Sequence, residues 1–102
     1  MTTITVINPL AVKPGRIDEF IASQRAFANA MCSRHVGLLG GRMYRNEDGS
    51  KTVLISLFES RESQSVLMRS AEFQAHLARM REMVDSSAPE PFQEAYTYGA
   101  FE

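Results

Sequence analysis

Apolar and polar residues alternate with a period of two at the start of the chain and then follow a helical spacing. The segment 3–12, TITVINPLAV, alternates and is rich in β-branched residues, which predicts a strand. After the break KPGR, apolar residues at helical spacing predict a helix over 16–34. Two further strands are predicted over 35–47 and 52–60, joined by a hairpin turn at Asp48-Gly49.

The second half of the chain predicts two helices and one more strand. A short helix is predicted over 61–69, and the amphipathic pattern of 70–84, SAEFQAHLARMREMV, predicts another with Ser70 as its N-cap. Residues 92–101, FQEAYTYGAF, predict a fourth strand. This order is that of the ferredoxin-like α+β fold, βαββαβ with an antiparallel sheet. A chain of 102 residues has room for one domain, which we expect to span residues 1–102.

The predicted sheet is apolar on both faces. In the third strand, Leu54 and Phe58 point to one face, whereas the other face carries Val53, Ile55 and Leu57. Helices can cover only one face, so the second apolar face needs a partner, and a two-fold contact with a second copy is the commonest solution. We therefore expect a homodimer in which two sheets face each other.

The second strand carries the pair Gly40-Gly41, which predicts a β-bulge or the close approach of another group.

Composition excludes several classes of protein. Eleven basic and twelve acidic residues give a formal net charge of −1, without the basic excess that nucleic acids or anionic membranes require. No apolar run approaches the ~20 residues of a membrane span, and the N-terminus lacks the basic start of a secretion signal. The single cysteine, Cys32, excludes an intramolecular disulfide. These features predict a cytoplasmic protein.

Four segments in this order carry a resemblance to a known family: VKPGRIDEF, GLLGGRMYRNEDGSKTVLISLFES, SAEFQAHLARM and PFQEAYTYG. From about Ile4 to Gly99 the chain resembles the antibiotic biosynthesis monooxygenase family, within the dimeric α+β barrel superfamily. The resemblance implies small homodimers with a cavity between the sheet and the helices of each protomer. It also implies oxidation of electron-rich aromatics, such as anthrones and quinols, with molecular oxygen and without flavin or metal. Close relatives degrade heme or isomerise signalling sugars.

Two polar residues on apolar faces are the candidate catalytic groups. His76 interrupts the helical stripe of 70–84, and an imidazole changes its charge near neutral pH. Asn8 shares a strand face with Ile4, Val6 and Leu10, where a buried amide needs a partner. Each has a structural alternative: a core histidine bonded to a carbonyl or carboxylate, and an asparagine bonded to the backbone where a proline interrupts the ladder. The resemblance implies that both positions border the cavity.

The remaining candidates would bind the substrate. An aromatic wall would suit a planar ligand, and methionines would suit an apolar ligand of variable shape. Gln24 would place a polar group in the cavity, and Arg42 would bind an anionic oxygen. The alternatives are packing in the core or the dimer interface, and ordinary solvation. The aromatic and methionine candidates are Phe58, Tyr44, Phe27, Met68 and Met80.

Neither a metal site nor heme cleavage is favoured. His35 lies at the start of a predicted strand, and no His-x-x-x-His or Glu-x-x-His spacing occurs. The heme-degrading relatives combine an asparagine on the first strand, a tryptophan on the third and a histidine on the late helix. Here Phe58 replaces the tryptophan. His76 follows Phe73 by three residues rather than four, a rotation of ~100° around the helix.

These observations predict a cofactor-independent monooxygenase acting on a small quinol, anthrone or phenol. Such a substrate gives its own electrons to oxygen once deprotonated, so the protein has to bind it, stabilise the anion and exclude water. His76 would take the proton and Asn8 would hold the developing charge. The alternatives on the same scaffold are a non-catalytic binding protein for a small hydrophobic ligand, an isomerase and a heme-degrading enzyme.

Overall fold

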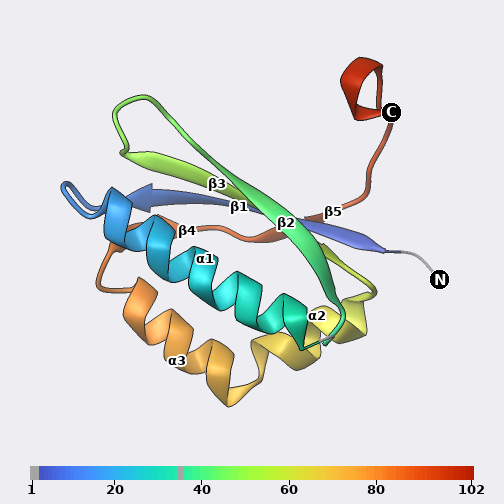
Figure 1. Cartoon of the computed structure of the whole chain (residues 1–102), viewed down its shortest axis with the longest axis horizontal. Helices are drawn as coiled ribbons and strands as arrows, with labels where there is room; N and C mark the ends of the chain where they lie inside the picture. Colours follow the sequence, from blue (N-terminus) through green and yellow to red (C-terminus); the bar gives the residue numbers. More distant parts are fainter. Residues whose placement is uncertain (1–2, 35) are drawn as a thin grey trace.

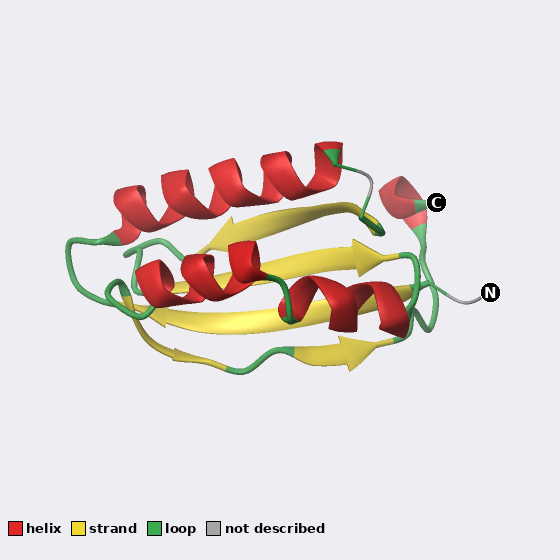
Figure 2. Ribbon diagram, turned by 90° about the horizontal axis from the view of Figure 1, so that it is seen from below, coloured by secondary structure: helices red, strands yellow, loops and turns green. Residues whose placement is uncertain are grey.

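A computed structural model describes residues 3–34 and 36–102; His35 lies outside the described residues. Five strands form one antiparallel sheet: β1 (Ile4–Val12), β2 (Leu38–Arg45), β3 (Lys51–Phe58), β4 (Val84–Ser87) and β5 (Glu90–Phe92). The helices are α1 (Ile17–Ser33), α2 (Arg61–Met68) and α3 (Ala71–Met80), followed by a short 3₁₀ helix, η1 (Gly99–Phe101). The helices cover one face of the sheet (Figures 1 and 2). The predicted α+β ferredoxin-like fold is confirmed.

Strand β1 lies at the centre of the sheet. It pairs with β3 on one side and with β4 and β5 on the other, and β2 pairs with β3 at the edge. The predicted N-cap is also confirmed, because the Ser70 hydroxyl accepts a hydrogen bond from the backbone N–H of Phe73 at 3.1 Å. In the hairpin turn, the Asp48 carboxylate accepts from Ser50 N–H at 2.9 Å, and Gly49 has a positive φ of 76°.

Two predicted boundaries in the second half were wrong. Helix α3 ends at Met80 rather than at residue 84, because Val84 pairs with Val12 and so belongs to the sheet. The strand predicted over 92–101 is instead formed by β4 and β5, which begin earlier, and only Phe92 of the predicted segment is in a strand. Phe92 pairs with Thr5 at the beginning of β1, so the following residues run past the end of their partner strand.

The core is divided into two apolar clusters between the sheet and the helices. One cluster contains Ile4, Val6, Met31, Phe58 and Leu67, and the other contains Leu10, Val12, Phe20, Met80 and Met83. β1 contributes two residues to each cluster, and Asn8 lies between them on the same strand. The helix-facing side of the sheet is therefore interrupted at its middle by a polar side chain.

The other face of the sheet carries the apolar side chains predicted there. Alternation along β3 directs Val53, Ile55 and Leu57 to this outer face, and Leu57 is 37% exposed. Beyond β5 the chain leaves the sheet and ends in η1 (Figure 1). In this final segment Tyr96, Tyr98 and Phe101 are exposed. Within the described residues, an apolar surface thus remains open to solvent.

The predicted bulge occurs in β2. The register against β3 shifts between Leu38 and Gly40, and Gly41 lies so close to β3 that an added Cβ would be 2.5 Å from the carbonyl oxygen of Ile55. At Gly40, by contrast, an added Cβ would meet no atom within 4 Å. The two adjacent glycines therefore have different physical reasons for being there.

This contrast predicts different effects for two neighbouring substitutions. Gly41→Ala is expected to lower the free energy of unfolding by about 1–3 kcal/mol, because β3 has to move to admit the methyl group. Gly40→Ala is expected to stay within about 0.5 kcal/mol of the wild type. Urea unfolding of both variants measures the difference, and equal losses would contradict the close approach at Gly41.

Candidate functional site

The imidazole of His76 is buried between α3 and α1. Its side chain is 3% exposed, and its ring stacks on Phe27 of α1 with centroids 4.0 Å apart and planes 7° from parallel. Phe73, one turn earlier on α3, lies 6.3 Å from the same ring in a tilted orientation. The apolar stripe of α3 therefore brings the histidine into an aromatic environment contributed by both helices.

One hydrogen bond fixes the protonation pattern of this ring. His76 Nε2 lies 2.8 Å from the Gln24 side-chain oxygen Oε1, which can only accept a hydrogen bond. Nε2 therefore carries the proton of the neutral ring and donates it to Gln24, which leaves an unprotonated Nδ1. This Nδ1 is buried and has no hydrogen-bond partner among the described residues. The site thus contains a free imidazole lone pair shielded from water.

Burial also keeps this imidazole neutral. Desolvation, and after it the positive charge of Arg79, lowers the pKa of His76 to about 4. At neutral pH the ring is therefore an acceptor through Nδ1 and a donor through Nε2.

Asn8 forms a hydrogen bond with the backbone, as its structural alternative expects. Its Oδ1 accepts a hydrogen bond from the backbone N–H of Ala88 at 2.9 Å. Ala88 lies in the gap between β4, where Ser87 pairs with Leu10, and β5, where Glu90 pairs with Ile7. The Asn8 side chain thus replaces a hydrogen bond that the interrupted ladder lacks. Only the acceptor half of the amide is used in this bond, and its NH₂ group carries two donors.

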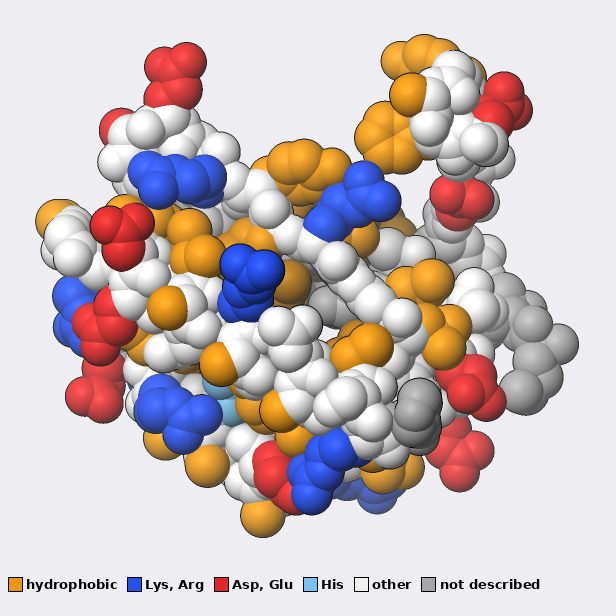
Figure 3. All heavy atoms as spheres, in the orientation of Figure 1, with side chains coloured by type: hydrophobic (Ala, Val, Ile, Leu, Met, Phe, Trp, Pro, Cys, Tyr) orange, Lys and Arg blue, Asp and Glu red, His pale blue; other side chains and the backbone are white. Residues whose placement is uncertain are grey.

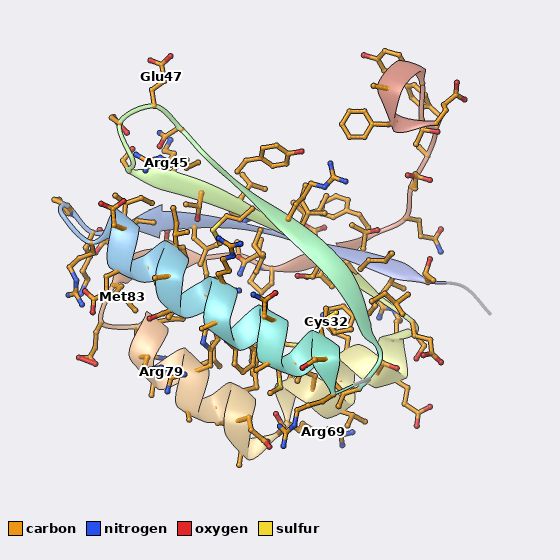
Figure 4. All side chains as sticks on the ribbon, in the orientation of Figure 1. Cys32, Arg45, Glu47, Arg69, Arg79 and Met83 are labelled. Atoms are coloured by element: carbon orange, nitrogen blue, oxygen red, sulfur yellow. The ribbon has the colours of Figure 1, made fainter. Side chains whose placement is uncertain are left out.

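A surface groove runs between α1 and α3 beside the buried histidine. It has a volume of about 400 Å³ and is lined by Ala26, Phe27, Ala30, Met31, Glu72, Ala75 and Arg79. Figure 3 shows apolar side chains with basic and acidic ones among them over these two helices, and Figure 4 shows the position of Arg79 on α3. Phe27 connects the groove to the buried site, because the same ring lines the groove and stacks on His76.

A second hollow, of about 300 Å³, lies where β3 leads into α2 and is lined by Val36, Glu59, Ser60, Glu62, Ser63 and Val66. None of the predicted site residues lines it.

The structure brings some of the predicted site residues together and separates others. Gln24 and Phe27 both contact His76. Phe58 and Met80 belong to the two core clusters, one on each side of Asn8. The others lie elsewhere: Met68 is exposed at the end of α2, and Arg42 and Tyr44 lie on the outer face, opposite Ile55 and Val53 of β3.

Arg42 and Tyr44 interact with each other on the outer face. The Arg42 guanidinium donates a hydrogen bond to the Tyr44 hydroxyl at 3.2 Å and lies over the ring of Phe101, 5.6 Å from its centroid.

Sequence reasoning did not select Arg79. The available signal was its position three residues after His76, which places two side chains on neighbouring parts of one helix face. Within residues 3–34 and 36–102, no cluster of three or more His, Cys, Asp or Glu side chains could hold a metal ion. None of the helices in this part of the chain is long and apolar enough to cross a membrane.

Comparison with known proteins identifies the family. The model of the family "Antibiotic biosynthesis monooxygenase" matches residues 3–79, about three quarters of the chain. The chain belongs to this family. A comparison with curated proteins finds no match.

Solved structures share the fold of this family member. A mutant of SnoaB, a cofactor-independent oxygenase from Streptomyces nogalater, is 20% identical with a TM-score of 0.83, over 95% of this chain and 97% of that chain. A protein from Bordetella bronchiseptica assigned to the antibiotic biosynthesis monooxygenases is 24% identical, with a TM-score of 0.81 over 94% and 100%. A conserved protein from Methanosarcina mazei is 18% identical, with a TM-score of 0.80 over 92% and 94%.

The buried imidazole predicts how the stability of this family member depends on pH. In the unfolded chain His76 binds a proton near its ordinary pKa of ~6.5, whereas in the folded chain its pKa is about 4. Between these values the unfolded state binds more protons, so the free energy of unfolding falls as the pH falls through this window. We expect His76 to contribute about 3 kcal/mol of the stability lost between pH 7 and pH 4.

The variant His76→Gln tests this contribution, because glutamine stays neutral throughout. Urea unfolding of both proteins at pH 7, 5 and 4 should give a smaller acid loss for the variant. Equal losses would show that another group is responsible.

Proposed function

We propose that this protein is a cofactor-independent monooxygenase that oxidises a small electron-rich aromatic of the quinol, anthrone or phenol type. The observation that carries the proposal is the buried Nδ1 of His76, a neutral acceptor without a partner among the described residues. Its hydrogen bond to Gln24 and its stacking on Phe27 hold the ring in one orientation. The family match and the fold shared with a cofactor-independent oxygenase support the proposal.

The proposed reaction needs no external reductant. In an anthrone, the ring CH₂ group is oxidised to a carbonyl and gives up four electrons. Molecular oxygen accepts these four electrons, and one of its atoms becomes the carbonyl oxygen while the other leaves as water with the two hydrogens. The protein has to remove a proton, hold the anion and exclude bulk water from the reaction.

His76 takes the proton through Nδ1 in this proposal. In a quinol or phenol the hydroxyl has a pKa of ~10, and His76 has a pKa of about 4, so this transfer is uphill by roughly 8 kcal/mol. A turnover of ~10 per second corresponds to a total barrier of about 16 kcal/mol. Proton transfer to His76 is therefore compatible with ordinary enzymatic rates and leaves about half of the barrier for the reaction with oxygen.

Asn8 stabilises the negative oxygen that forms. Its Oδ1 is bonded to Ala88, and the donors of its NH₂ group match the need of an oxyanion. Gln24 and Phe27 hold His76, and Phe27 also lines the adjoining groove.

Oxygen uptake by the purified, metal-stripped protein with anthrones, naphthols and hydroquinones tests the proposal. His76→Ala is expected to lower kcat/KM by about 10²–10⁴-fold, the usual range for removal of a general base. Asn8→Asp keeps an acceptor for Ala88 N–H but removes the NH₂ donors, so it is expected to lose turnover with the fold intact.

The other outcomes identify the alternatives. Uptake that stays at the autoxidation rate in the wild type would remove the oxygenase. Product formation without oxygen uptake would indicate an isomerase, and saturable binding without turnover would indicate a ligand-binding protein. An uptake that is unchanged in His76→Ala would place the chemistry elsewhere in the chain.

We also propose that two copies associate through the outer face of the sheet. The support is the exposed apolar surface over β3 and the exposed aromatic residues Tyr96, Tyr98 and Phe101 beyond β5. In this assembly Arg42 and Tyr44 take part in the interface rather than in substrate binding, because they point to that face.

A charged residue on the outer face is expected to prevent this association. Leu57→Asp should give a monomer in size-exclusion chromatography with light scattering, because a buried unpaired carboxylate is costly. Val66→Asp, at a 51% exposed position of α2, is the matched control and should leave the dimer unchanged. A monomeric wild type, or a dimer that Leu57→Asp leaves intact, would contradict this interface.

A further inference from the structure

The groove between α1 and α3 is apolar along most of its length and charged at two places. Alanine, phenylalanine and methionine side chains form its walls, and among the described residues Glu72 and Arg79 are its charged lining residues. Its volume of about 400 Å³ lies within the range of pockets that bind small molecules.

The two charges of the groove are not equivalent. Glu72 forms an ion pair with Arg34 of α1 at 2.8 Å, which satisfies its carboxylate and lowers its pKa. Arg79 forms no ion pair with any residue in the described ranges. The charge that the groove offers to a ligand is therefore positive.

Arg79 is also close enough to the buried site for its charge to act there, since it disfavours a second positive charge on His76. The same charge favours a negative charge on a ligand, because the two effects have the same electrostatic origin. A guanidinium offers several donors to one anionic oxygen or a carboxylate, and such charge-assisted hydrogen bonds are roughly twice as strong as neutral ones.

We propose that the α1–α3 groove binds an aromatic anion, with Arg79 as the residue that selects the anionic form. The ring of the ligand packs along Phe27 and the alanines, and its carboxylate lies at Arg79. This inference rests on the proposed function, because it takes the ligand of the groove to be the substrate that His76 deprotonates. It adds that this substrate carries a negative charge. Aromatic acids have the required chemistry, because their carboxylate pairs with Arg79 while a separate hydroxyl keeps the proton that His76 takes. Neutral aromatics of the same shape lack the charge.

Binding of an isosteric pair tests the inference without any turnover. 2-Naphthoate and 2-naphthamide differ in charge but hardly in shape, and neither has the hydroxyl that the proposed oxidation needs. Isothermal titration calorimetry is expected to give the wild type a Kd for naphthoate at least about tenfold lower than for naphthamide, as a charge-assisted hydrogen bond requires.

Three variants separate the possible results. Arg79→Gln should abolish the preference for the anion, and Arg79→Lys should restore part of it. Arg61→Gln, an exposed arginine at the start of α2 that does not line the groove, makes the same change in net charge and should retain the preference. Equal affinity for both ligands in the wild type, or a preference that persists in Arg79→Gln, would overturn the inference.

The mass of the Arg79→Gln variant in solution tests the remaining alternative, that a second copy of the chain occupies the groove. A change in oligomeric state in this variant would mean that the groove contacts a second copy, which also overturns the inference. Because naphthoate binding does not depend on oxygen uptake, the anion preference and the oxygenase can each fail while the other stands.

Discussion

The buried hydrogen bond from His76 to Gln24 is the interaction on which the site depends. It joins α3 to α1 through two polar groups placed in otherwise apolar stripes. Removing one partner would leave the other unsatisfied at a cost of ~1–3 kcal/mol, so each residue requires the other. The bond also determines which nitrogen carries the proton, and through it the chemistry that the opposite nitrogen can perform. Stability and reactivity at this place therefore follow from one contact.

Periodicity in the sequence was sufficient for most of the fold. The alternation of β1 and the helical spacing of α1 are local patterns, and they predicted both elements within a residue or two. The C-terminal end of α3 and the division of the last strand into β4 and β5 depend instead on which residues of β1 are available for pairing. Val84 joins the sheet because Val12 lies opposite, and the strand ladder ends where β1 begins. The periodicity of a segment does not indicate which distant segment it pairs with.

The site was predictable to the extent that its residues break an apolar pattern. His76, Gln24 and Asn8 are polar residues on buried faces, and each has a specific hydrogen bond or an unpartnered atom in the structure. Arg42 and Tyr44 were harder to place, because the bulge before Gly40 shifts the register and a shift of one residue exchanges the two faces of a strand. Arg79 lies among solvated residues of α3, where sequence alone does not distinguish a groove from open surface.

The division of the core has a consequence for how this scaffold can change over time. Each cluster has its own residues from β1 and from the helices, so a substitution in one apolar half leaves the residues of the other half in place. Changes at separated positions tend to be additive in free energy. A lineage can therefore repack one apolar half while the other keeps the chain folded. The histidine site follows a different rule, because His76 and Gln24 are joined by one hydrogen bond and have to change together.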